Sequence, residues 1–165
     1  MGKIPDKFKE TVDLLANKFN GKQCAFRGTA SLVLQGLDMS VDDIDLLTDK
    51  DTALLANKLL NKYLVDEVKY RQSEKFKSFY GKFNINSIQI EVMGDWQIRD
   101  IKGSWCDSFD ASDDECSEIN LNGKSVRVTK IETELVTYSK MGRWTAFQKI
   151  KRQLGSRKSN QQVLI

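Results

Sequence analysis

The stretch FRGTASLVLQGLDMSVDDIDLL, residues 26–47, sets how the rest of the chain is organised. A short apolar strand leads into a turn at Gly28-Thr29, a helical pattern follows, and a second strand carries Asp43 and Asp45. Alternate side chains of a strand share a face, so we expect both carboxylates on one face and the apolar residues beside them in the core. Two such carboxylates repel each other unless a cation lies between them. A site with oxygen ligands alone suits Mg²⁺ better than zinc or copper.

A third acid occurs in a later β-rich run, residues 87–93. Glu91 lies there between Ile90 and Val92, as a single charge in an otherwise apolar segment. If this strand lies beside the strand of Asp43 and Asp45, the three carboxylates form one site.

In this order, the three elements resemble the polymerase-beta-like nucleotidyltransferase superfamily in its small, minimal form. Gly28-Thr29 matches the turn of that family, with Thr in place of Ser, and Asp43-Ile44-Asp45-Leu46 matches its acidic strand. The third element is matched by Ile90-Glu91-Val92, whereas Arg27 stands where the family usually has an apolar residue. The resemblance covers residues 23–93 well and the remainder of the chain only loosely.

The resemblance implies an α+β fold, a mixed β-sheet with helices packed on one side. It also implies transfer of a nucleoside monophosphate from an NTP such as ATP to an acceptor hydroxyl, by a two-metal carboxylate mechanism with Mg²⁺ or Mn²⁺. Asp43, Asp45 and Glu91 would be the metal ligands and catalytic residues. The residues expected to contact the nucleotide are Gly28, Thr29, Ser31, Lys140 and Arg143, and Arg27 could also reach a phosphate.

Other interpretations stay open at this stage. Gly28 could form a plain strand-to-helix turn, Asp42 and Asp43 could cap the start of a helix, and Glu91 could face solvent. A chain of this fold could also be a catalytically inactive module that binds a nucleotide or a partner, or a metal-dependent phosphohydrolase. The acceptor could be an RNA end, a protein side chain, an antibiotic or a small metabolite.

Composition limits the function classes. The chain has 165 residues and no histidine, which excludes Ser-His-Asp and Cys-His catalysis and leaves a carboxylate as the general base. We expect one domain over residues 1–154, ending in a helix at about 131–154, and a flexible basic tail over residues 155–165. No apolar run is long enough to span a bilayer and the N-terminus lacks a signal-peptide core, so we expect a cytoplasmic protein.

Charge is unevenly distributed along the chain. Residues 140–165 hold seven basic residues and no acid. Because the net charge of the whole chain is +3, the rest of the chain has a net charge of about −4. This segment suggests an anionic partner such as RNA, or else an ordinary solvated helix face. Residues 107–118 hold six acids and no base, in a loop of unassigned role.

Periodicity and turn signals predict the remaining elements. We expect helices over residues 4–20, 29–35 and 49–60, and strands over residues 23–27, 44–48 and 64–70. Two hairpins should follow, one pairing residues 76–83 with 87–93 and one over residues 118–128 with Asn122-Gly123 as its turn.

Overall fold

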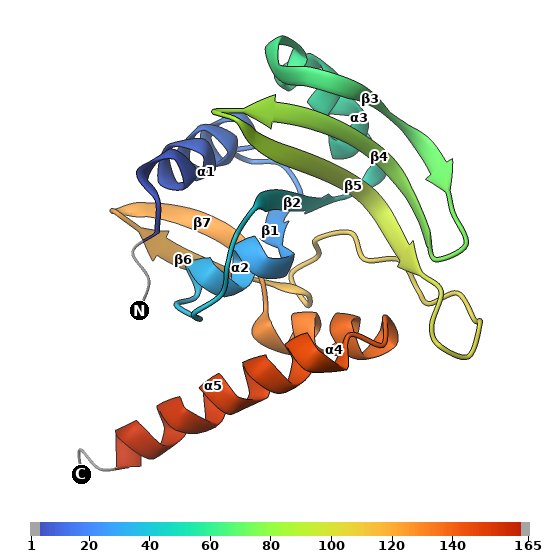
Figure 1. The fold of residues 1–165 in the computed structure, drawn as a ribbon. Helices are drawn as coiled ribbons and strands as arrows, with labels where there is room; N and C mark the ends of the chain where they lie inside the picture. Colours follow the sequence, from blue (N-terminus) through green and yellow to red (C-terminus); the bar gives the residue numbers. More distant parts are fainter. Residues whose placement is uncertain (1–3, 163–165) are drawn as a thin grey trace.

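The fold is built on one mixed sheet of seven strands, seen in a computed structural model that describes residues 4–162 (Figure 1). The strands are β1 (Cys24–Arg27), β2 (Asp43–Thr48), β3 (Leu64–Gln72), β4 (Phe76–Ile85), β5 (Ile88–Ile98), β6 (Cys116–Leu121) and β7 (Lys124–Thr129). Their spatial order is β3-β4-β5-β2-β1-β7-β6. The β2–β5 and β1–β7 pairs are parallel, and the other neighbours are antiparallel. This arrangement confirms the predicted α+β class.

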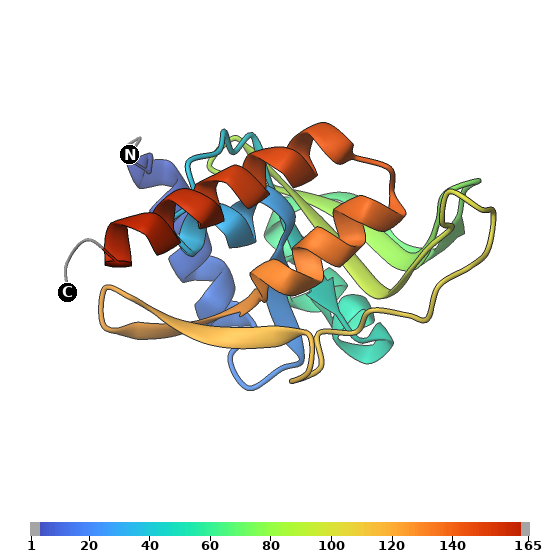
Figure 2. The same ribbon diagram turned by 90° about the horizontal axis from the view of Figure 1, so that it is seen from below.

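The helices are α1 (Asp6–Lys18), α2 (Gly28–Leu34), α3 (Lys50–Leu59), α4 (Ile131–Lys140) and α5 (Trp144–Gln162), with a 3₁₀ turn at Asn61–Tyr63. Apolar side chains of α1, α2 and α3 share one core cluster with side chains from one face of the sheet. The helices α4 and α5 pack instead onto α2, where Leu32, Tyr138 and Ile150 form a separate cluster. Seen from below, α4 and α5 lie next to each other across the molecule (Figure 2).

The alternation of β2 divides its side chains between the two faces of the sheet. Ile44 and Leu46 are buried in the core against the helices, as the sequence predicted. Asp43 and Asp45 point to the opposite face, where Leu47 contributes to a second, smaller cluster around Trp96. The sheet therefore has one face devoted to packing and one face that combines packing with acidic side chains.

Local sequence signals explain several element ends. The Asp49 side chain caps α3 by accepting a hydrogen bond from the Thr52 N–H at 2.8 Å. The β6–β7 hairpin turns at Asn122 and Gly123, with φ angles of 52° and 82°, which confirms the predicted Asn-Gly turn. The β4–β5 turn is tighter than predicted, because only Asn86 and Ser87 separate the two strands.

Strand β5 also extends beyond its predicted end at Met93. It continues to Ile98 because β4 pairs with it from Ile85 opposite Ile88 to Phe76 opposite Ile98, with a register shift between Lys77 and Phe79. Gly94 permits this continuation next to α3, since a Cβ there would lie 2.5 Å from the Cβ of Ala53.

The C-terminal region differs from the prediction of one helix over residues 131–154. Gly142, at φ +70°, separates α4 from α5, as a glycine commonly does at a helix end. Helix α5 then continues through Gly155 to Gln162, so the segment expected to be a flexible tail is helical up to that residue, and residues 163–165 lie outside the described part. Arg157 anchors this extension by donating hydrogen bonds to the carbonyl oxygens of Gln35 and Gly36. Between residues 4 and 162, no helix is both long enough and apolar enough to cross a membrane.

Candidate active site

Three carboxylates lie together on the sheet face opposite the α1–α3 core. Asp43 and Asp45 come from β2 and Glu91 comes from the parallel neighbour β5, where it is the direct register partner of Asp45. One oxygen of each carboxylate lies within 4.8 Å of the others. The structure thus brings the three predicted acids into one cluster.

The cluster forms part of a cleft of about 560 Å³. One wall comes from the Gly28-Thr29 turn, another from the β3–β4 hairpin, and a third from α4 and the residues that follow it. The lining residues are Arg27, Gly28, Thr29, Asp43, Asp45, Arg71, Gln72, Ser73, Phe76, Ser78, Tyr80, Glu91, Met93, Trp96, Tyr138, Met141 and Arg143. This size and the mixture of aromatic and charged groups are typical of small-molecule sites.

Burial raises the pKa of both β2 carboxylates. The pKa of Asp45 is raised to about 7 by burial, opposed by Arg27 and reinforced by Asp43 and Glu91. The pKa of Asp43 is also raised, first by burial and then by Glu91. Oδ1 of Asp45 is buried and has no hydrogen-bond partner among the described residues. A cluster of like-charged oxygens with an unpartnered buried atom fits a hard divalent cation such as Mg²⁺ or Mn²⁺.

Neighbouring side chains fix the position of Glu91. Its Oε1 accepts hydrogen bonds from the Tyr80 hydroxyl at 2.7 Å and from Nε2 of Gln89 at 2.9 Å. Nζ of Lys82, the register partner of Glu91 on β4, lies 3.9 Å from the same oxygen. Three neighbouring side chains therefore contact Oε1 of Glu91.

The Gly28-Thr29 turn lies against the acidic strand. Gly28 has φ +62°, and a Cβ at this position would lie 3.1 Å from Oδ2 of Asp45. The Gly28 N–H donates a 2.7 Å hydrogen bond to Oε1 of Glu134, a buried residue of α4, and so does not point into the cleft. Thr29, the next residue, lines the cleft. Gly28 also lines the cleft, but it has no side chain and its N–H is already donated, so the turn residue that can offer a side-chain contact to a ligand is Thr29.

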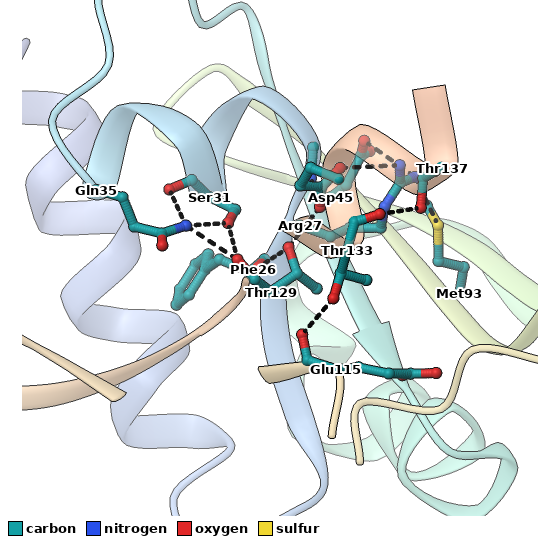
Figure 3. Close-up of polar contacts among 12 residues, drawn as sticks. Phe26, Arg27, Ser31, Gln35, Asp45, Met93, Glu115, Thr129, Thr133 and Thr137 are labelled. Atoms are coloured by element: carbon teal, nitrogen blue, oxygen red, sulfur yellow. Dashed lines mark hydrogen bonds and ion pairs between the residues drawn. The ribbon is translucent and has the colours of Figure 1, made fainter. Parts of the chain in front are cut away.

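The other predicted nucleotide contacts are only partly brought to the cleft. Arg143 lines it. Ser31 does not, because α2 turns its fully buried hydroxyl toward β7, where it donates to the Thr129 carbonyl oxygen at 2.7 Å (Figure 3). Lys140 lines an adjacent hollow instead and donates to Sγ of Cys106 at 3.3 Å. The prediction for Ser31 is therefore corrected, and Lys140 stands beside the cleft.

Glu134 and Tyr80 are among the residues of the site that the sequence did not predict. Glu134 lies within a long predicted helix and belongs to none of the motifs. The one available signal is its spacing, three residues after Ile131 and four before Tyr138, which puts an acid on the buried face of that helix. From the sequence pattern alone, Tyr80 is expected to pack on the sheet. Its hydrogen bond to Glu91 could not be predicted, because it depends on the pairing of β4 with β5.

Comparison with known proteins finds similar structures but no similar sequence family. No family model matches the chain, and no curated protein matches its sequence. A protein from Thermotoga maritima provisionally named a nucleotidyltransferase has 27% identity and a TM-score of 0.71, with 90% of each chain covered.

Two further matches are antibiotic adenylyltransferases. The lincosamide enzyme LnuA, in its lincomycin-bound structure, has 15% identity and a TM-score of 0.55, covering 91% of this chain and 98% of its own. ANT(2'')-Ia, solved with adenylyl-2''-tobramycin, has 15% identity and a TM-score of 0.56, covering 93% of this chain and 92% of its own. The chain therefore has the polymerase-beta-like nucleotidyltransferase fold.

Proposed function

We propose that this protein is a metal-dependent nucleotidyltransferase that moves a nucleoside monophosphate from an NTP, such as ATP, to an acceptor hydroxyl. The observation that carries this proposal is the convergence of Asp43, Asp45 and Glu91 in one cleft, beside the Gly28-Thr29 turn. The structural matches to nucleotidyl- and adenylyltransferases support it.

The reaction forms one P–O bond and breaks another. The acceptor oxygen attacks the α-phosphorus, the bond from that phosphorus to the α–β bridging oxygen breaks, and pyrophosphate leaves. The chain has no histidine, so the base is one of the three carboxylates that line the cleft. Asp43 and Asp45 are assigned to both metal ions, so Glu91 takes the proton of the acceptor hydroxyl. Tyr80 and Gln89 hold Oε1 of Glu91, which leaves Oε2 for this task.

The β2 carboxylates and the turn position the NTP. Asp43 and Asp45 would hold two divalent ions, and Glu91 would be a further ligand of one of them. When bound, these ions supply charge stabilisation to the reaction. Thr29 offers a hydroxyl to the phosphates, and Arg143 and Arg71 offer guanidinium groups from opposite walls of the cleft.

The acceptor is a molecule with a free hydroxyl that reaches the Glu91 side of the cleft. A compact acceptor is the first candidate, because LnuA and ANT(2'')-Ia were solved with an antibiotic and an adenylylated antibiotic, respectively. An RNA end or a protein hydroxyl is the alternative, and the basic residues of α5 favour RNA among these two.

The direct test is a transfer assay with α-³²P-labelled NTPs, Mg²⁺ or Mn²⁺, and a panel of acceptors. The panel includes tobramycin, lincomycin, tRNA and an unrelated protein mixture. We expect label on one acceptor class together with release of pyrophosphate.

The matched variants are Asp45→Asn, which should abolish transfer, and Asp42→Asn, which removes a neighbouring exposed acid and should not. Nucleotide binding without turnover on any acceptor would indicate the alternative, a catalytically inactive binding module. Labelled nucleoside monophosphate free in solution would indicate a hydrolase.

A further inference from the structure

A row of charged residues crosses four adjacent strands at one level of the sheet. Arg27 on β1 pairs in register with Asp45 on β2, Asp45 with Glu91 on β5, and Glu91 with Lys82 on β4. A cation therefore stands at each end of the acidic pair. Lys82 is about one-third exposed, whereas the Arg27 side chain is 8% exposed.

Arg27 is a buried guanidinium beside a site that fits divalent cations. Its Nη1 lies 3.7 Å from Oδ2 of Asp45 and donates to Sδ of Met93 at 3.4 Å (Figure 3). Its Cζ lies 4.1 Å from the ring centroid of Trp96. A fixed positive charge at this distance from a metal ligand competes with a metal ion for the same carboxylate. Arg27 is also the position at which this chain departs from the apolar residue usual in the family that it resembles.

Glu134 supplies the compensating charge from α4. Its side chain is 1% exposed, and Oε2 lies 3.8 Å from Nη2 of Arg27. Among the described residues, Oε2 has no hydrogen-bond partner, so the guanidinium is its nearest opposite charge. Its other oxygen, Oε1, accepts hydrogen bonds from the Gly28 N–H and the Thr129 hydroxyl. One side chain thus joins α4 to the turn and to Arg27.

We propose that Glu134 is a positioning residue of the site: it neutralises Arg27, so that a buried guanidinium can support Asp45 without weakening the affinity of the carboxylate cluster for a divalent cation. This inference rests on the proposed function, because it assumes that Asp43, Asp45 and Glu91 bind the metal. It adds a charge-balancing pair, contributed by β1 and α4, to that site.

The test is the affinity of the nucleotide-free protein for Mn²⁺, measured by electron paramagnetic resonance titration. Glu134→Gln should weaken Mn²⁺ binding by on the order of tenfold, because Arg27 is then balanced by Asp45 alone. Arg27→Met should strengthen it, because the Glu134 carboxylate then lacks its cation and adds unbalanced negative charge near the cluster. The double variant Arg27→Met/Glu134→Gln should bind Mn²⁺ within about twofold of the wild type, because both charges have been removed together.

A merely structural role for Glu134 gives a different pattern. In that case both single variants weaken Mn²⁺ binding and the double variant is worse than either, which would overturn the inference. If a single variant does not fold, the double variant decides: folding with near-normal Mn²⁺ affinity supports charge compensation, and weakened binding contradicts it. If the wild type binds Mn²⁺ but Glu134→Gln binds equally well, this inference alone fails. If the wild type does not bind Mn²⁺, the proposed metal site fails with it.

Discussion

Gly28 and Asp45 lie so close together that a Cβ on Gly28 would push the Asp45 carboxylate aside by a few tenths of an ångström. A Cβ on Gly28 would lie 3.1 Å from Oδ2 of Asp45, and the φ angle of +62° is in the left-handed region. The glycine therefore serves two purposes, since it permits the turn and lets the carboxylate lie over it.

Gly28→Ala should destabilise the protein and weaken Mn²⁺ binding. The left-handed backbone costs about 1–2 kcal/mol for a residue with a Cβ, and the contact with Asp45 adds a displacement of the carboxylate. The control is Gly21→Ala, because Gly21 has φ +71° and no atom lies within 4 Å of the position that its Cβ would take. Urea denaturation and Mn²⁺ titration check both variants. Equal effects on Mn²⁺ affinity from the two substitutions would contradict the role of the contact.

The metal-free protein should lose stability as the pH rises from about 4 toward 7. Asp45 has an ordinary pKa of 3.8 and a folded pKa of about 7, so the folded state binds an extra proton between these values. The contribution is fully present below the unfolded pKa and is lost as the pH rises through the folded pKa. Urea denaturation in the presence of EDTA, over a series of pH values, measures this slope.

Asp45→Asn should abolish transfer and flatten that pH dependence. At about pH 8 the free energy of unfolding should exceed that of the metal-free wild type by roughly 1–4 kcal/mol, because the buried charge is gone. Near pH 4 the two proteins should be nearly equal. A variant that is less stable than the wild type at both pH values would show that Asp45 stabilises the metal-free fold.

Tyr80→Phe should lower the rate of transfer by about tenfold while leaving the fold intact. The substitution removes the hydroxyl that donates to Oε1 of Glu91 at 2.7 Å and keeps the ring. Steady-state kinetics should show the loss in kcat rather than in KM for the NTP. Tyr70→Phe is the control, because Tyr70 is 55% exposed on the edge strand β3. A loss of the same size in both variants would argue against positioning of Glu91 by Tyr80.

Arg157→Ala should loosen the connection between α2 and β2. Arg157 donates to the carbonyl oxygens of Gln35 and Gly36, and the loss of these contacts should cost about 1–2 kcal/mol. Hydrogen exchange should become faster at the amides of residues 36–38. The neighbouring Lys158→Ala is the matched control, since Lys158 is an exposed cation of the same helix. Unchanged exchange in Arg157→Ala would show that the end of α5 does not support this loop.

The acidic strand and the class of fold are readable from the chain alone. The alternation of Asp43, Ile44, Asp45 and Leu46 fixes which side chains share a face, because that depends only on the period of an extended chain. The Asn122-Gly123 turn is likewise predictable, since its left-handed backbone requires those residue types. The pattern around Glu91 indicates a third acid, but its place opposite Asp45 requires the parallel pairing of β2 with β5.

Which other side chains reach the site depends on the packing of the folded chain. Ser31 and Thr29 are two residues apart, yet the helix turns one toward Thr129 and leaves the other in the cleft. Glu134 lies 106 positions from Gly28 and meets it through the packing of α4 against α2. Contacts over such separations have no periodic signal in the chain, because they depend on how helices and strands pack rather than on the local backbone.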